Sequence, residues 1–255
     1  MFPLALFPTV PDNLQDMKAR DALVYQNTFM KNALIRALNI TYEMARKIEA
    51  VHPEFCSFLA YMESVCNILS LHLEGDDVFF QTLSLHCNEV AVVNNEIAIA
   101  FRKDLNSLLG LIGEWIESPD SYQHARLQDC LKKIESSITE VLHTQMSRFR
   151  GDALPNSIDD ETLRVLVRGV SSLLSIEPPI DQCFPENMIW FGSRVDIAIL
   201  LPFCTSHHDP LTSKYWPPVT SDAIEAIPDL ARVHPHLWKF APFDPVTRNA
   251  TAVAL

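Results

Sequence analysis

The sequence predicts an all-α protein with an irregular C-terminal part, and three observations support this prediction. Apolar residues recur at helical spacing through most of residues 13–150. The 255 residues include only six glycines, and these are not clustered as a phosphate-binding loop or a dinucleotide fingerprint requires. Most of the 17 prolines and three of the four tryptophans lie after Ile176, so long helices are not expected there.

Four helices are expected before residue 150. The first covers Asp21–Ala50, which carries an amphipathic stripe. The second begins at Pro53, since proline is tolerated in a first turn, and Gly75 lies near the end of its apolar run. The third and fourth are expected over about Asn88–Glu117 and Ser121–Arg150. Helices of this length with short connections favour an up-down four-helix bundle.

A fifth amphipathic helix is expected to begin near Asp159, with acidic residues in its first turn. From about residue 177 the chain is expected to form an ordered, extended tail, because its aromatic content is atypical of disorder. The run "VDIAILLPF" is its only strand-like segment. We therefore predict a helical bundle with a fifth helix over residues 1–176, and an irregular extension over residues 177–255 that packs on it.

Composition excludes several classes of function. The net charge of −12 and the pI of about 5.1 disfavour binding to nucleic acid or to an anionic membrane surface. No apolar run approaches the roughly 18–20 residues of a membrane span, and the apolar start lacks a basic region typical of a signal peptide. The six cysteines form no CxxC pair, and no GxSxG motif occurs. A cytoplasmic protein with reduced thiols is expected.

Four short motifs occur in an order that resembles a known family. They are "KNALIRALN" (Lys31–Asn39), "HLEGDDVFF" from His72, "SHHDPLTSKYWPPV" and "LWKFAPFD". The chain resembles the hemerythrin-like, HHE cation-binding family in its fungal form. The resemblance implies a four-helix bundle in which histidines and carboxylates from all four helices hold two iron ions.

The resemblance also implies that most of the iron ligands are replaced. The ligand position of the first helix holds Lys31, while His72 and Asp76 remain on the second. The positions of the third helix hold Ile97 and Phe101, which would fill the vacated volume with hydrocarbon. His143 remains on the fourth helix, where Ser147 stands in place of an acid. A diiron centre is therefore not expected, and no cofactor is predicted.

The residues at the former iron-ligand positions, both retained and replaced, form most of the predicted site. If the helices pack as the resemblance implies, four polar side chains converge on the bundle axis and serve as catalytic groups: Lys31, His72, Asp76 and His143. A small organic substrate would be bound by Ile97, Phe101, Glu96 and Trp216. Glu96 would face inward if the third helix were shifted by one residue.

Three interpretations of this cluster remain open at the sequence level. It could be a purely structural ion-paired core, with Asp76 compensating Lys31. It could bind a substrate in the former iron cavity and supply acid–base groups. It could hold a single metal ion, such as zinc, on His72, Asp76 and His143. The histidines of His207-His208-Asp209 are instead expected to stabilise a turn.

Three functions correspond to these interpretations. The leading hypothesis is a metal-independent isomerase, cyclase or lyase that acts on a small, largely apolar molecule in fungal secondary metabolism, a context implied by the resemblance. The second is a non-catalytic binding or scaffold protein. The third is a cation-binding protein that holds iron or zinc. The sequence does not predict an oligomeric state.

Overall fold

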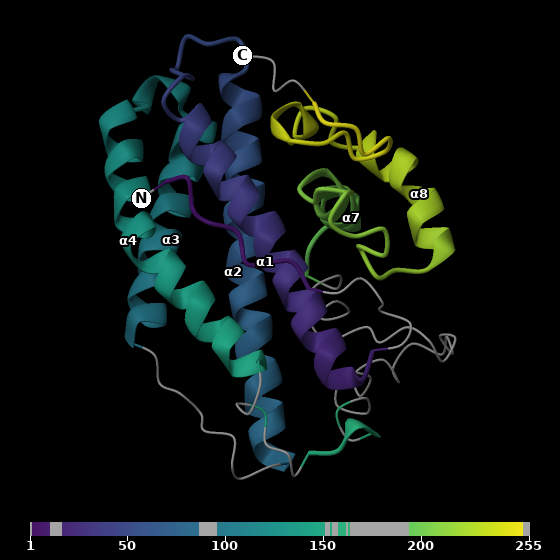
Figure 1. Cartoon of the computed structure of the whole chain (residues 1–255). Coiled ribbons are helices and arrows are strands. Elements are labelled where there is room, and N and C mark those ends of the chain that lie inside the picture. Colours follow the sequence, from purple (N-terminus) through teal and green to yellow (C-terminus); the bar gives the residue numbers. More distant parts are fainter. Residues whose placement is uncertain are drawn as a thin grey trace.

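The computed structural model describes residues 2–10, 17–86, 96–150, 154, 158–161, 163 and 194–251. Within these residues the chain is helical, and its only β-type pairing is an isolated bridge between Phe243 and Ala250. The all-α prediction is therefore confirmed (Figure 1). The helices are α1 (Ala19–Met44), α2 (Phe55–His86), α3 (Glu96–Glu117), α4 (His124–Phe149), α7 (Ile197–Ser206) and α8 (Ser221–Ala231), with the 3-10 helices η2 (Pro119–Ser121) and η5 (Trp238–Phe240).

The first four helices lie close to their predicted ranges, and they differ mainly at their ends. α1 stops at Met44, six residues before the predicted end. α2 continues through Gly75 to His86, because apolar residues beyond the glycine remain buried on the same helix. Residues 88–95, predicted as the start of the third helix, lie outside the described residues.

Helices α1 to α4 form a closed set of neighbours. Each packs against the next along the chain, and α4 packs back against α1. Successive helices run in opposite directions (Figure 1). Their inward apolar residues share one core, because each helix buries a stripe at helical spacing. We call α1 to α4 the four-helix group.

The prediction of a strand in "VDIAILLPF" was wrong, because these residues lead into and form most of α7. The carboxylate of Asp196 accepts a hydrogen bond from the backbone N–H of Ala198 and so caps the start of this helix. A short apolar run has no periodicity that distinguishes a buried strand from a buried helix. Residues 160, 161 and 163 are helical, and the rest of the predicted fifth helix lies outside the described residues.

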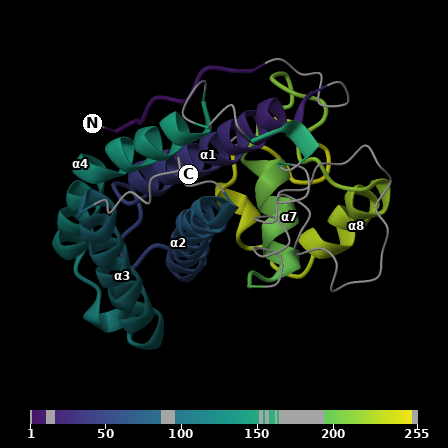
Figure 2. The same cartoon turned by 90° about the horizontal axis from the view of Figure 1, so that it is seen from below.

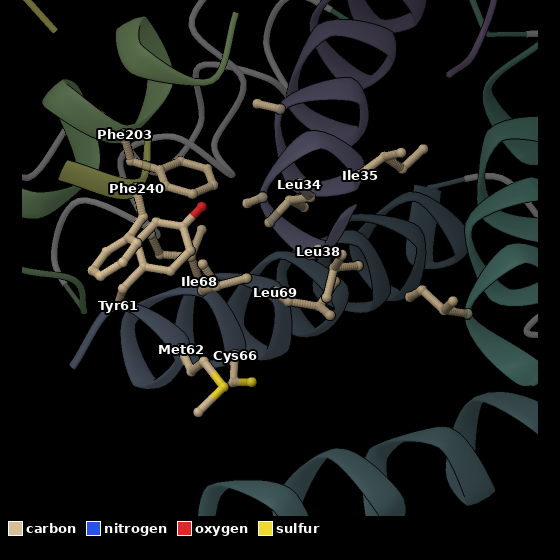
Figure 3. Close-up of a cluster of buried hydrophobic side chains, with 14 of the residues drawn as sticks. Leu34, Ile35, Leu38, Tyr61, Met62, Cys66, Ile68, Leu69, Phe203 and Phe240 are labelled. Carbon is tan, nitrogen blue, oxygen red and sulfur yellow. The ribbon is translucent and has the colours of Figure 1, made fainter. Parts of the chain in front are cut away.

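The segment of residues 194–251 packs on the four-helix group. α7 and α8 lie on the side of α1 and α2 that faces away from α3 and α4 (Figures 1 and 2). Tyr61 of α2 lies beside Phe203 and Phe240 of this segment (Figure 3). These rings belong to the same hydrophobic core as the four helices. The described part of the predicted extension thus combines two α-helices and a short 3-10 helix with irregular segments that join them.

None of the described helices combines the length and the apolar character that a membrane crossing requires.

Candidate functional site

Three of the four predicted polar residues meet in the interior, between α1 and α2. The Nζ atom of Lys31 lies 2.8 Å from Nε2 of His72 and 2.5 Å from Oδ2 of Asp76. The same nitrogen donates a hydrogen bond of 3.1 Å to Oδ1 of Asn27, one turn earlier on α1. We call Lys31, His72 and Asp76 the central triad.

Helical spacing explains this arrangement. Asn27 and Lys31 are four residues apart on α1, and His72 and Asp76 are four residues apart on α2. Residues at this spacing lie on the same face of a helix. Because α1 packs against α2, each pair faces the other and the amine of Lys31 reaches both side chains of α2.

The hydrogen-bond pattern assigns a role to each atom. An ammonium group has three N–H donors, and the Nζ atom of Lys31 has three acceptors, on Asn27, His72 and Asp76. With the amine protonated, Nε2 of His72 accepts, so the proton of a neutral His72 ring resides on Nδ1. The positive charge of Lys31 and the negative charge of Asp76 then form an ion pair inside the core.

Burial dominates the electrostatics of the central triad. The side chains of Lys31 and Asp76 are 0% exposed, and that of His72 is 8% exposed. Burial lowers the pKa of Lys31, although Asp76 opposes this shift. Burial, together with the charge of Lys31, lowers the pKa of His72 to about 3, so its imidazole is neutral near pH 7.

A second set of charges lies next to the central triad. Asp77 follows Asp76 and forms an ion pair of 2.5 Å with Arg102 of α3. The guanidinium of Arg148 lies over the ring of Phe80, 3.5 Å from its centroid. Burial raises the pKa of Asp77, while Arg102 lowers it. Arg148 also interacts electrostatically with Asp77 and Asp76, so this second set of charges is coupled to the central triad.

His143 does not join the central triad, so its predicted position on the axis was wrong. Its side chain is exposed, and its ring packs against Phe7, with 4.7 Å between the ring centroids. The neighbouring positions Val141, Leu142 and Gln145 of α4 are buried instead. The orientation of α4 about its own axis therefore turns His143 outward. Short sequence motifs did not predict this orientation.

The predicted lining of α3 is only partly internal. Phe101 is fully buried, as expected, whereas Ile97 is 36% exposed. Glu96 is the first residue of α3 and is also exposed. The expectation that Ile97 fills the axis was therefore wrong, and the alternative inward position of Glu96 is not observed either. Both residues lie in the first turn of α3, where the helix begins.

Trp216 is buried, but on the opposite side of α1 from the central triad. Its ring packs on Phe29, with 5.8 Å between centroids, and its Nε1 donates to the carbonyl of Cys204. Phe29 is two residues before Lys31, a spacing that places their side chains on opposite helical faces. Trp216 thus joins the C-terminal segment to α1 and does not line the predicted site.

Sequence reasoning missed two contributions to buried polar structure. Asn27 completes the hydrogen bonds of Lys31, and its spacing of four residues from Lys31 was the available signal. The hydroxyl of Tyr61 lies 2.8 Å from Nε2 of His207, and Nδ1 of His207 lies 3.1 Å from the carbonyl of Phe203. His207 therefore holds α7 against α2, a structural role of the kind predicted for this turn.

The residues present do not fit a diiron centre. The donor atoms of His72 and Asp76 both engage the ammonium of Lys31, whose positive charge would repel a metal ion. His143 faces outward, and Ile97 and Phe101, which stand at the ligand positions that the resemblance implies for α3, have no donor atom. Among the described residues, no group of three or more histidine, cysteine, aspartate or glutamate side chains is arranged to hold a metal.

Comparisons with known proteins found no match to a family model, to a curated protein or to a solved structure.

Proposed function

We propose that this chain is a hemerythrin-like four-helix protein that acts, without a metal ion, on a small and largely apolar organic molecule. The reaction would be an isomerisation, cyclisation or elimination, with the central triad as its acid–base groups. The observation that carries the proposal is the amine of Lys31, held in a desolvated core within hydrogen-bond distance of both His72 and Asp76.

This arrangement supports acid–base chemistry for a physical reason. A lysine whose pKa is lowered by burial exchanges its proton at lower cost near neutral pH than a solvated lysine. Such perturbed groups in a protein interior are frequent at functional sites. The ring of Phe149, whose centroid lies 5.6 Å from Nζ of Lys31, would offer an apolar contact to such a substrate.

Each residue would have a separate role. The ammonium of Lys31 would donate a proton to the substrate, and the resulting amine would accept one. Neutral His72, the most exposed of the three, would orient the amine and contact the substrate. Asp76 would keep its negative charge and balance the cation while the proton is on lysine.

The test combines a binding screen with proton exchange. Small apolar ketones and enones are first screened for those that raise the melting temperature of the protein. Each binder is then incubated with the protein in D₂O, and deuterium incorporation or rearrangement is followed by NMR. We expect acceleration of about 100-fold or more over buffer, as positioned acid–base groups provide.

The matched control is the double variant Lys31→Met/Asp76→Leu, which removes both buried charges and retains most of the side-chain volume. We expect it to fold and to lose the acceleration. The proposal is contradicted if this folded variant is as active as the wild type, or if no compound that binds is turned over or exchanged by the wild type.

A non-catalytic binding or scaffold role is the second candidate. It is favoured by the complete burial of Lys31 and Asp76. A buried ion pair can have a purely structural role, in which it fixes how two helices pack. In this case the double variant would bind the same compounds as the wild type, and neither protein would accelerate proton exchange.

A further inference from the structure

The segment of residues 2–10, which we call the N-terminal segment, lies along the four-helix group without forming helix or strand. It runs across α4 and α1 in both views (Figures 1 and 2). Phe2, Leu4 and Phe7 turn inward and are at most 8% exposed, whereas Leu6 is 42% exposed. The segment therefore contacts the helices through three apolar side chains.

Two asparagines of α1 hold the backbone of this segment. Oδ1 of Asn39 accepts from the N–H of Leu4 at 2.6 Å, and its Nδ2 donates to the carbonyl of Leu4 at 3.0 Å. Asn32 makes the same pair of bonds to Phe7, at 2.8 and 3.1 Å. Each carboxamide thus satisfies both backbone groups of one residue.

The spacing of the asparagines matches an extended chain. Asn32 and Asn39 are seven residues apart, which is about 10.5 Å along a helix. Leu4 and Phe7 are three residues apart, which is about 10 Å in an extended backbone. The two asparagines are therefore in register with every third residue of an extended peptide.

Side-chain contacts complete the recognition. The ring of Phe2 stacks on Tyr42, with 4.3 Å between centroids, and the N–H of Phe2 donates to Glu135 of α4. The ring of Phe7 packs on His143. Next to Phe2, a cleft of about 530 Å³ continues along α1, with Arg46 in its lining. The cleft is lined by Asn39 as well as by Phe2, so it borders the part of α1 that holds the N-terminal segment.

We propose that the seam between α1 and α4 is a docking groove for an extended peptide, and that residues 2–7 occupy it within the chain. The partner would be a peptide with apolar side chains at its first, third and sixth positions. The backbones of the third and sixth residues would bind Asn39 and Asn32. Backbone hydrogen bonds would supply affinity, and the apolar contacts would supply selectivity. This proposal is independent of the proposed enzymatic function.

The experiment uses a variant that lacks residues 2–9 and a fluorescein-labelled peptide of residues 2–8. Fluorescence anisotropy should show saturable binding to this variant. Binding to the wild type should be at least tenfold weaker, because the tethered segment competes at high effective concentration. A folded deletion variant that does not bind the peptide overturns the proposal.

Two comparisons test how the groove recognises its ligand. Asn32→Ala and Asn39→Ala, each in the deletion variant, should weaken binding about tenfold, while Asn106→Ala on the exposed face of α3 should leave it unchanged. A peptide N-methylated at Leu4 and Phe7 keeps its side chains but lacks the two donors. Undiminished binding of this peptide contradicts recognition through the backbone.

If the deletion variant does not fold, the full-length variant Phe2→Ser/Leu4→Ser/Phe7→Ser takes its place. This variant retains the chain length but loses the three apolar contacts that hold the segment. It should bind the labelled peptide at least tenfold more tightly than the wild type does. Equal binding by the two full-length proteins contradicts the proposal.

Discussion

At the scale of single residues, Lys31 places a positive charge in the interior of the four-helix group. Its ammonium has three acceptors, and these include both polar side chains that α2 directs toward it. The amine thereby lies within hydrogen-bond distance of both His72 and Asp76. An internal charge of this kind is stabilising only while its partner is present, because each ion alone would be buried without compensation.

The variant Lys31→Met should therefore be strongly destabilised. It leaves the carboxylate of Asp76 in the core without its ion-pair partner, and we expect a loss of about 3–5 kcal/mol in the free energy of unfolding. The double variant Lys31→Met/Asp76→Leu should recover most of this loss. Urea denaturation followed by circular dichroism measures both values.

The exposed pair of Lys47 and Glu43 provides the control, since its side chains are 46% and 59% exposed. Lys47→Met should change the free energy of unfolding by less than about 0.5 kcal/mol. If Lys31→Met behaved like Lys47→Met, the buried ion pair would not exist in solution.

At the scale of helices, the sequence predicted what depends on local spacing. Helical periodicity located α1 to α4, and the four-residue spacing of His72 and Asp76 placed them on one face. The rotation of α4 about its axis, which turns His143 outward, depends on contacts with other helices. The start of α3, and with it the exposure of Ile97, likewise depends on packing that short motifs do not encode.

The attachment of α7 to α2 should depend on the hydrogen bond between Tyr61 and His207. Because Nδ1 of His207 donates to the carbonyl of Phe203, its Nε2 needs the proton of the tyrosine hydroxyl. Tyr61→Phe leaves this buried nitrogen without a donor, at a cost of about 1–3 kcal/mol. Urea denaturation should show this loss, and hydrogen exchange should become faster in α7.

Tyr122→Phe is the matched control for that substitution. The hydroxyl of Tyr122 lies 3.4 Å from Nδ1 of His124, a long hydrogen bond between partly exposed groups. Its loss should cost less than about 0.5 kcal/mol. Similar losses for the two variants would show that the bond between Tyr61 and His207 has no special role.

At the scale of the whole molecule, buried histidines link stability to pH. Burial lowers the pKa values of His72 and His207 to about 3 and that of His208 to about 4. In the unfolded chain these rings have an ordinary pKa near 6.5 and take up protons at higher pH than the folded protein does. Acidification below about pH 6.5 therefore favours unfolding, whereas stability is retained above it.

Between pH 7 and pH 5 each of these histidines should cost about 2 kcal/mol of stability. Urea denaturation at pH 7 and at pH 5 measures the sum of the three contributions to the free energy of unfolding. Equal stability of the wild type at pH 7 and pH 5 would mean that the three rings titrate as solvated histidines.

The most direct test of the central claim is the titration of the Lys31 side chain by NMR, in protein labelled with ¹³C and ¹⁵N in lysine. Comparison with Lys31→Met assigns its signal. We predict that Lys31 loses its proton at lower pH than the exposed lysines, because its amine lies in a desolvated core. A titration that coincides with those of the exposed lysines would place the amine in water and contradict the buried triad.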